Sequence, residues 1–137
     1  QAKGMSVRGG KITLDPKHDG SLNTLGYVYA ERGTNLDKAK SLVERALEIS
    51  PENGAYLDSL GWIYFKMGEY DEALAIFKDA DKLLKDPVIY EHMGDTYLKL
   101  NERDMALKYW NLSLELLPGQ QKIIKKIEEL NNIQASN

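Results

Sequence analysis

Apolar and polar residues near the start of the chain follow the period of a helix, and they form two stripes instead of one. Between residues 21 and 31, one arc of such a helix gathers Leu22, Leu25, Gly26 and Tyr29. A second arc, about 100° away, gathers Asn23, Tyr27 and Ala30. The two stripes predict a helix with two contact faces, of which the first packs against a partner helix.

The same pattern returns twice at a nearly constant interval. A leucine or methionine precedes a glycine, and a tyrosine follows three residues later, in Leu25-Gly26-Tyr29, Leu60-Gly61-Tyr64 and Met93-Gly94-Tyr97. The glycines lie 35 and then 33 residues apart. An alanine and, four residues on, a larger apolar residue follow in each unit: Ala39 and Val43, Ala73 and Phe77, and Ala106 and Trp110.

These positions resemble the tetratricopeptide repeat family, which has a period of about 34 residues and the pattern W-x₂-L-G-x₂-Y…A-x₃-F…P. The resemblance covers roughly residues 19 to 134. It implies an all-α fold, an α-solenoid of three helix-turn-helix repeats followed by a C-terminal capping helix. We expect the repeats at residues 19–53, 54–86 and 87–118, and the capping helix with its tail at residues 119–137.

Residues 1–18 show no helical periodicity and contain three glycines. Leu14, Asp15 and Pro16 look like the end of a preceding repeat. We therefore expect this segment to be a flexible lead-in or the remnant of such a repeat, and the chain to derive from a longer array.

Local chemistry predicts where the helices begin and end. In the first repeat we expect helices over about residues 21–31 and 37–49. A residue that can end the first helix in a left-handed conformation stands at Gly33, Gly68 and Asn101. An acid at the positive end of the second helix stands at Asp37, Asp71 and Asp104. Asp86 before Pro87 predicts a cap followed by proline at the first helical position.

After Pro118 the pattern continues for half a repeat. Ile124 and Ile127 take the places of Leu57 and Leu60. A helix that closes the core should be polar on its outer side. That side is expected to carry Lys122, Lys125, Lys126 and Glu129.

The resemblance also implies a partner-binding surface. In the family, the second stripe of each first helix lines a concave groove that binds a peptide or helix of another protein. Carried over by position, the groove comprises Asn23, Tyr27, Ala30, Asp58, Trp62, Phe65, Glu91, Asp95 and Leu98, with Lys66 and Lys99 at its edge. Because aromatic side chains dominate binding hot spots, we expect Tyr27, Trp62 and Phe65 to contact the partner. Alternatively, these three only pack between successive helices.

Family members that grip chaperone tails hold the terminal carboxylate with lysines, asparagines or arginines. This chain places Asp58 and Glu91 there, and both would repel a carboxylate. The expected partner is therefore a protein segment that is apolar and carries basic residues.

Composition bears on the possible partners and on the compartment of the protein. The chain of 137 residues is 42% apolar and 28% charged, which is ordinary for one globular domain. It lacks an apolar run of roughly 20 residues, so we expect no membrane insertion. It has no cysteine, which permits cytosol and periplasm alike. Beyond residue 18 the chain holds 14 basic and 20 acidic side chains, and this net charge of −6 would repel nucleic acid.

Nothing in the sequence predicts catalysis or a cofactor. Ser59 and His92 hold equivalent places in adjacent repeats, but no strained turn, oriented base or oxyanion donor accompanies them. His18 and His92 are too few and too separated to bind a metal ion.

We therefore expect a non-catalytic protein–protein interaction scaffold. Two alternatives stay open. The array could be the accessory segment of a larger protein whose catalytic or other domain lies outside this chain. It could also be a self-assembly module, in which the uncovered face of the first repeat binds another copy.

Overall fold

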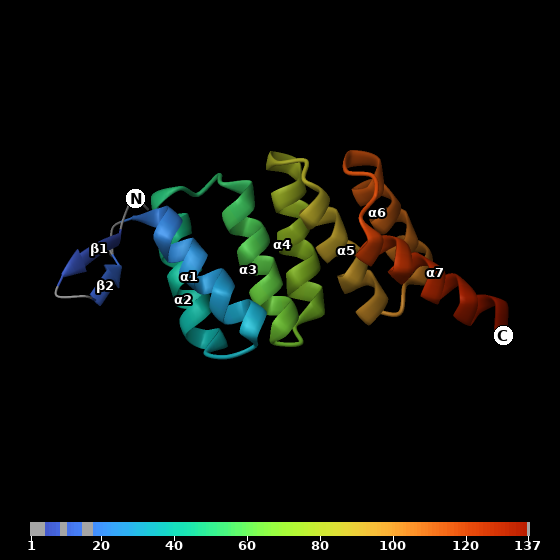
Figure 1. Cartoon of the computed structure of the whole chain (residues 1–137), viewed down its shortest axis with the longest axis horizontal. Helices are drawn as coiled ribbons and strands as arrows, with labels where there is room; N and C mark the ends of the chain where they lie inside the picture. The colour runs from blue at the N-terminus through green and yellow to red at the C-terminus, as the bar shows by residue number, and fades with distance from the viewer. Residues whose placement is uncertain (1–4, 9–10, 15–17, 137) are drawn as a thin grey trace. The chain divides into compact units, whose positions relative to one another are not determined.

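The computed structural model describes residues 5–8, 11–14 and 18–136. The chain divides into two compact units, residues 1–83 and residues 84–137, and Figure 1 labels their elements in chain order. The expected end of a preceding repeat at Asp15 and Pro16 lies outside the described residues.

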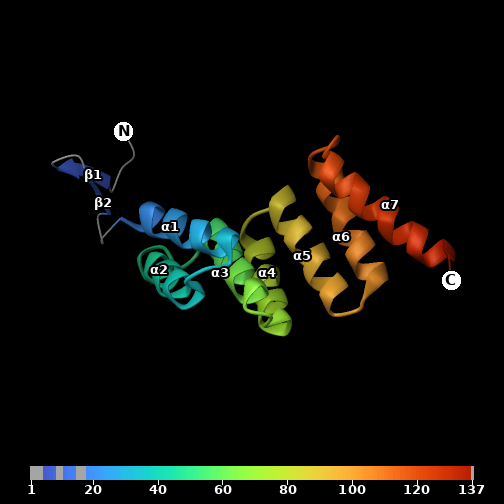
Figure 2. The same cartoon turned by 60° about the horizontal axis from the view of Figure 1, so that its bottom comes forward.

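The first unit contains two helical hairpins and two short strands. Helices α1 (Asp19–Arg32) and α2 (Leu36–Ile49) form one hairpin, and α3 (Gly54–Lys66) and α4 (Tyr70–Leu83) form the other (Figures 1 and 2). Strands β1 (Met5–Arg8) and β2 (Lys11–Leu14) pair antiparallel, with Met5 opposite Leu14. The helical pattern did not predict these strands, because four residues give an alternating pattern too few positions to be recognised.

The second unit contains one hairpin and a following helix. Helices α5 (Pro87–Lys99) and α6 (Arg103–Leu116) pair antiparallel, and α7 (Gln121–Ser136) follows them (Figure 2). The hydroxyl of Ser113 on α6 donates a hydrogen bond of 2.7 Å to the carbonyl oxygen of Pro87 at the start of α5. The expected all-α helical-repeat class is confirmed by these helices.

The predicted helix ends are confirmed within two residues in the first repeat. The backbone is left-handed at each residue proposed to end a first helix: φ is 68° at Gly33, 82° at Gly68 and 62° at Asn101. Asp86 caps α5 by accepting a hydrogen bond of 2.7 Å from the Val88 amide, and Pro87 is the first helical residue. The helix boundaries therefore follow from local chemistry.

Each hairpin is built around a glycine that lets the second helix approach closely. A methyl group at Gly26 would lie 2.6 Å from Cγ2 of Val43, and one at Gly61 would lie 2.6 Å from the Phe77 ring. A methyl group at Gly94 would overlap the ring of Trp110 in the same way. Val43, Phe77 and Trp110 are almost fully buried. The large residue of one helix thus fills the space that the glycine of the other leaves open.

A polar contact joins the two hairpins of the first unit. The carboxylate of Asp19 accepts hydrogen bonds from the hydroxyls of Ser50, at 2.8 Å, and Tyr56, at 3.0 Å. These hydrogen bonds, from Ser50 first, hold the pKa of Asp19 below its ordinary value. The start of α1 is thereby tied to Ser50, which follows α2, and to Tyr56 in the first turn of α3.

Among the helices that the structure describes, none has both the length and the apolar character needed to span a bilayer.

The close approach at Gly61 predicts that Gly61→Ala lowers the stability of the fold, whereas a change from glycine to alanine normally raises it. Alanine in place of glycine normally stabilises a helix interior by about 1 kcal/mol. In Gly61→Ala the added methyl group must displace the buried Phe77 ring, and such overpacking costs about 1–3 kcal/mol. After subtraction of the propensity gain, we expect the free energy of unfolding, measured by urea denaturation, to fall by up to about 2 kcal/mol.

Ala55→Gly provides the control, because Ala55 is exposed on the same helix. It should cost at most about 1 kcal/mol, through helix propensity alone, because Ala55 lies in the first turn of α3. A Gly61→Ala variant that is more stable than the parent chain would contradict the packing account.

Candidate functional site

Two of the three expected partner-contacting residues, Trp62 and Phe65, belong to an aromatic cluster on α3, whereas the third, Tyr27, lies on α1. The rings of Trp62 and Phe65 stack with centroids 4.7 Å apart and planes 10° apart. The ammonium of Lys66 lies 5.0 Å from the centre of the Trp62 ring, within cation–π range. Phe65 also meets the ring of Tyr70, at the start of α4, edge-on at 5.2 Å. The cluster presents an apolar surface beside one cation.

Trp62 serves mainly to pack α3 against α1. Only 9% of its surface is exposed, and its indole N–H donates a hydrogen bond of 2.6 Å to the carboxylate of Glu31 on α1. The accessible part of the cluster is therefore supplied by Phe65, which is half-buried, and by the exposed Lys66. Glu31, which sequence reasoning did not include, lies one residue beyond the predicted position Ala30.

The other predicted residues of the first unit differ in how accessible they are. Ala30 is fully buried and Asp58 is 7% exposed, so a partner could touch little of either. Tyr27 and Asn23 are half-buried. The side-chain oxygen of Asn23 is buried and has no hydrogen-bond partner among the described residues. An unpartnered buried oxygen is costly, so Asn23 is a polar group that a ligand could satisfy.

In the second unit, two predicted groove residues are engaged by α7. The ammonium of Lys126 lies 2.9 Å from a carboxylate oxygen of Glu91, and 2.9 Å and 3.1 Å from the two oxygens of Asp95. Asp95 also accepts a hydrogen bond of 3.1 Å from the indole of Trp110. Lys126 was expected on the outer, solvated side of the last helix, and that expectation is wrong. Periodicity could not reveal it, because the ion pair joins α7 to residues 31 and 35 positions earlier.

The ion pair shifts the pKa values of its members. Burial alone would raise the pKa of Glu91, but the hydrogen bond and charge of Lys126 outweigh it and lower the pKa. Burial alone would lower the pKa of Lys126, but hydrogen bonds and charges from Asp95 and Glu91 raise it. The charged forms of both groups are therefore stabilised. The carboxylates of Glu91 and Asp95 are already paired with a cation.

A cleft of about 330 Å³ opens between α7 and the α5–α6 hairpin. Its apolar walls are Leu98, Trp110, Leu130 and Ile133. Its polar and charged residues are Asp95, Asn101, Arg103, Lys126 and Glu129. Of the predicted residues, Leu98 and Asp95 line this cleft, whereas Lys99 is exposed but is not among its lining residues.

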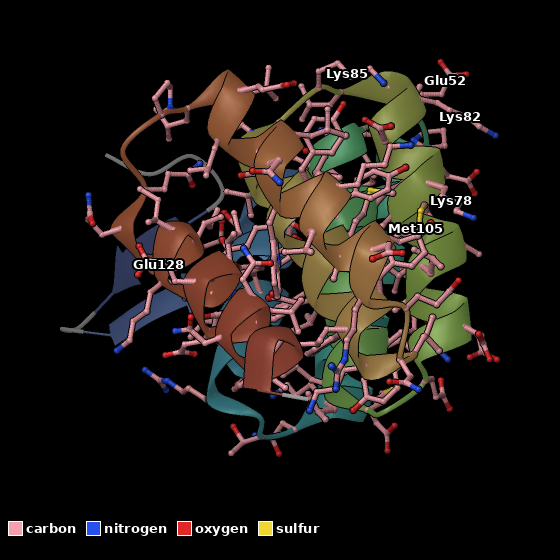
Figure 3. The ribbon with its side chains drawn as sticks, turned by 90° about the vertical axis from the view of Figure 1, so that its right-hand side faces the viewer. Glu52, Lys78, Lys82, Lys85, Met105 and Glu128 are labelled. Carbon is pink, nitrogen blue, oxygen red and sulfur yellow. The ribbon has the colours of Figure 1, made fainter. Side chains whose placement is uncertain are left out.

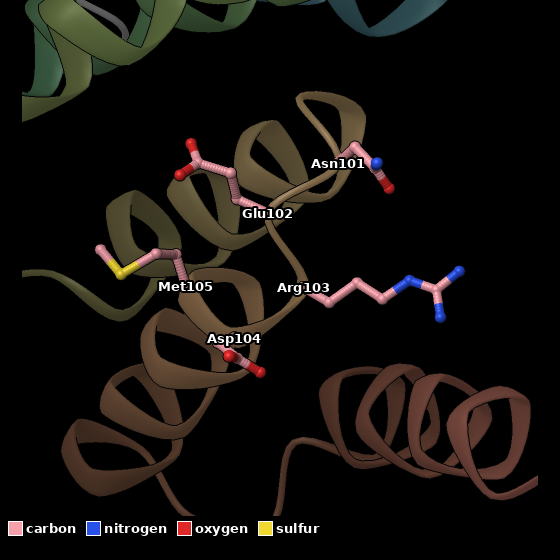
Figure 4. Close-up of a pocket in the computed structure, with 5 residues that line it drawn as sticks. All are labelled: Asn101, Glu102, Arg103, Asp104 and Met105. Atoms are coloured by element: carbon pink, nitrogen blue, oxygen red, sulfur yellow. The ribbon is translucent and has the colours of Figure 1, made fainter.

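A wider hollow of about 630 Å³ lies beside the connection between α5 and α6. Figure 4 shows its lining: Asn101, Glu102, Arg103, Asp104 and Met105. All five belong to one turn and the start of one helix, so no second wall faces them. Arg103 extends away from this turn, toward the side on which α7 lies (Figure 4). The narrower cleft is the better-formed site.

The described residues contain no group of three histidine and acidic side chains that could hold a metal ion. Ser59 is buried, and its hydroxyl donates to the carbonyl oxygen of Ala55 in the preceding turn. His92 is also buried, with 4% of its surface exposed. His18 accepts a hydrogen bond from the Ser21 amide and so caps α1. Each of these side chains has a structural role.

The sequence is similar to known helical-repeat proteins. The sequence model of the family described as tetratricopeptide repeat matches residues 20–86. The TPR repeat-containing protein PA4667 of Pseudomonas aeruginosa is 32% identical over 84 residues, which are 61% of this chain and 14% of that protein. The chain thus spans about one seventh of the length of this relative.

Solved structures share the fold. A thermophilic TPR protein of Thermus thermophilus, TTC0263, superposes with a TM-score of 0.74 at 25% identity, covering 84% of this chain and 64% of that one. The first TPR domain of RPAP3 (Spaghetti), bound to the HSP90 peptide SRMEEVD, superposes with a TM-score of 0.77 at 20% identity, covering 88% and 96%. At 20% identity the second match shows the fold alone.

The Lys126 ion pair predicts a pH-dependent contribution to stability. Glu91 has a lowered folded-state pKa, so its contribution is present above its ordinary value of about 4.5 and is lost as pH falls through the folded value. In Lys126→Met the carboxylates of Glu91 and Asp95 lose their half-buried partner. We expect this variant to lose about 1–3 kcal/mol of stability at pH 7, measured by urea unfolding, and the deficit to shrink in acid.

Lys125→Met is the matched control, because Lys125 is exposed on the same helix. Its effect should stay within about 0.5 kcal/mol at either pH. Equal deficits for the two variants, or a Lys126→Met deficit that does not change with pH, would show that the ion pair does not hold α7.

Proposed function

Because the chain belongs to the tetratricopeptide repeat family, whose repeats are typical of interaction scaffolds, we propose that it binds a peptide or helix of another protein without catalysing a reaction. The aromatic cluster of the first unit carries this proposal. Phe65 and Lys66 combine an accessible apolar ring with a cation that lies over the Trp62 ring.

The cluster suits partner contact for physical reasons. Its rings are held in place by packing, since Phe65 stacks on Trp62, and Trp62 is anchored by Glu31. Binding therefore requires little further ordering of side chains, and preorganised aromatic anchors contribute most of the free energy at typical interfaces. The buried side-chain oxygen of Asn23 on α1 could accept a hydrogen bond from a partner amide if the half-buried side chain turned toward it.

The chemistry of the partner follows from the charges beside this cluster. Glu31 on α1 is exposed and places its carboxylate against the Trp62 indole. An acidic peptide, such as the one bound to RPAP3, would meet this carboxylate unfavourably. The proposed partner is therefore a segment with an apolar anchor and no cluster of acids. A basic residue in the partner would pair with Glu31 and not with Glu91 or Asp95, because Lys126 already occupies those two carboxylates.

A second candidate function is supported by the lengths of the relatives. This chain matches 14% of PA4667, so repeats like these occur within much longer proteins. We infer that the array can serve as the interaction segment of such a protein, recruiting a partner for a domain outside residues 1–137. Sequencing the gene on both sides of this region tests the inference, which fails if no further coding sequence is present.

The proposed role of the cluster predicts a specific loss of binding. Phe65→Ala and Lys66→Glu should each weaken capture of a partner from a cell lysate, followed by quantitative mass spectrometry. Truncating a hot-spot residue costs about 2 kcal/mol, which corresponds to roughly 30-fold weaker binding. Trp62→Ala is a poorer test, since it would also cost about 3–5 kcal/mol of folding stability.

Two controls in the same unit separate binding from folding. Ile49→Ala removes another exposed apolar side chain, and Lys78→Glu reverses another exposed lysine, which Figure 3 shows projecting from α4. Both should retain capture, and all four variants should melt within a few degrees of the parent chain. If Phe65→Ala and Lys66→Glu recover the same proteins in the same amounts as the controls, the cluster is not the binding surface.

A further inference from the structure

The residue that caps helix α1, His18, carries a titratable side chain. The Ser21 amide donates a hydrogen bond of 3.3 Å to Nδ1 of the His18 ring. A ring that accepts at Nδ1 is neutral and holds its proton on Nε2, whereas an imidazolium has a proton on both nitrogens and cannot accept. Protonation of this ring therefore removes the cap. Because Ser21 is only 5% exposed, water has little access to replace the lost acceptor, and the loss is costly.

The cap lies in the same helical turn as the contact that joins the two hairpins of the first unit. Asp19 follows His18 directly, and its carboxylate accepts from the hydroxyls of Ser50 and Tyr56. A methyl group at Gly20 would lie 3.3 Å from Cε1 of the His18 ring and 3.7 Å from the Tyr56 hydroxyl, so the ring and the hydroxyl flank one position. Fraying of this first turn would move Asp19 away from both of its donors.

Two other titratable groups lie beside the His18 ring. On α1, the hydrogen bonds from Ser50 and then Tyr56 hold the pKa of Asp19 below its ordinary value. On α3, burial and then the hydrogen bond to Asp19 raise the pKa of Tyr56 above its ordinary value. The segment after α2 contributes Ser50, which does not titrate. Histidine is the side chain that ordinarily changes charge between pH 5 and 8, so in this range Asp19 stays anionic and Tyr56 stays neutral while the ring can be protonated.

A positive charge is unfavourable at the place of the cap. The first turn of a helix carries the positive end of the macrodipole, so an imidazolium is repelled by the amides that a neutral ring caps. The carboxylate of Asp19 offers the imidazolium an acceptor, but it already accepts from Ser50 and Tyr56. Pairing of the ring with Asp19 would compete with both of these hydrogen bonds. By either route, protonation weakens the contact between the hairpins.

We propose that His18 is a pH-sensitive switch at the start of α1. The neutral ring holds the first turn closed and so keeps Asp19 against Ser50 and Tyr56. Protonation in mild acid releases the first turn and, with it, the contact between the two hairpins of the first unit. The switch lies at the opposite end of α1 from Glu31, which anchors Trp62. It is therefore separate from the aromatic cluster and does not depend on the proposed function.

The test compares the intact parent chain with His18→Asn and His18→Ala by urea unfolding at pH 7.5 and pH 5.0. Asparagine is a good cap that does not titrate, and alanine does not cap. Comparison at the same pH cancels the titration of His92 and of the carboxylates, which all three chains share. At pH 7.5 the parent should match His18→Asn, and the unfolding constant of His18→Ala should be about fivefold larger, as expected for one lost cap. At pH 5.0 the parent should match His18→Ala instead.

A second substitution tests whether the switch releases Asp19. Tyr56→Phe removes one of the two hydroxyls that donate to Asp19. At pH 7.5 it should raise the unfolding constant by the same factor in the parent chain and in His18→Asn. At pH 5.0 the effect should disappear in the parent chain and persist in His18→Asn, which keeps its first turn closed.

Three results would overturn the proposal. If the parent chain stays as stable as His18→Asn at pH 5.0, the protonated ring leaves the first turn closed. If the parent chain and His18→Ala are equally stable at pH 7.5, the neutral ring does not cap the helix. If Tyr56→Phe has the same effect on the parent chain at both pH values, protonation does not release Asp19.

Discussion

Each hairpin depends on one contact, in which a large side chain of the second helix packs against a glycine of the first. At Gly26, Gly61 and Gly94 the backbone lies so close to Val43, Phe77 and Trp110 that no β-carbon fits. This contact fixes the distance and register of the two helices, because a shift by one residue would bring a side chain into the ring. Short helices of 13 or 14 residues are marginal by themselves, so burial of this kind holds them in place.

In the second unit, an ion pair supplements the apolar packing that holds α7. Among the described side chains of helix α7, only Ile123 and Leu130 are almost completely buried. Lys126 adds a half-buried ammonium that three carboxylate oxygens and the Trp110 ring surround. The same contact withdraws Glu91 and Asp95 from the surface available to a partner. A stabilising interaction thus also decides which chemistry the second unit presents, and a cleft is left where α7 covers the hairpin incompletely.

In the first unit, the side chains proposed for recognition also pack the helices together. Trp62 was expected to line the groove, but most of its surface is used to join α3 to α1. Under the proposed function, its contribution to binding is to hold Phe65 and Lys66 in fixed positions. A repeat scaffold can vary its partner in this way, because the buried ring maintains the fold while its accessible neighbours vary.

The sequence alone determined the helices, their ends and the partners within each hairpin. These depend on interactions between residues that are close in the chain, such as the cap at Asp86 and the left-handed residues Gly33 and Gly68. Only the tertiary structure decided which of the predicted site residues remain accessible. The Lys126 ion pair, the Glu31 acceptor of Trp62 and the cleft beside Arg103 all arise from contacts between separate helices, and the orientation of side chains across such contacts cannot be obtained from a repeating pattern.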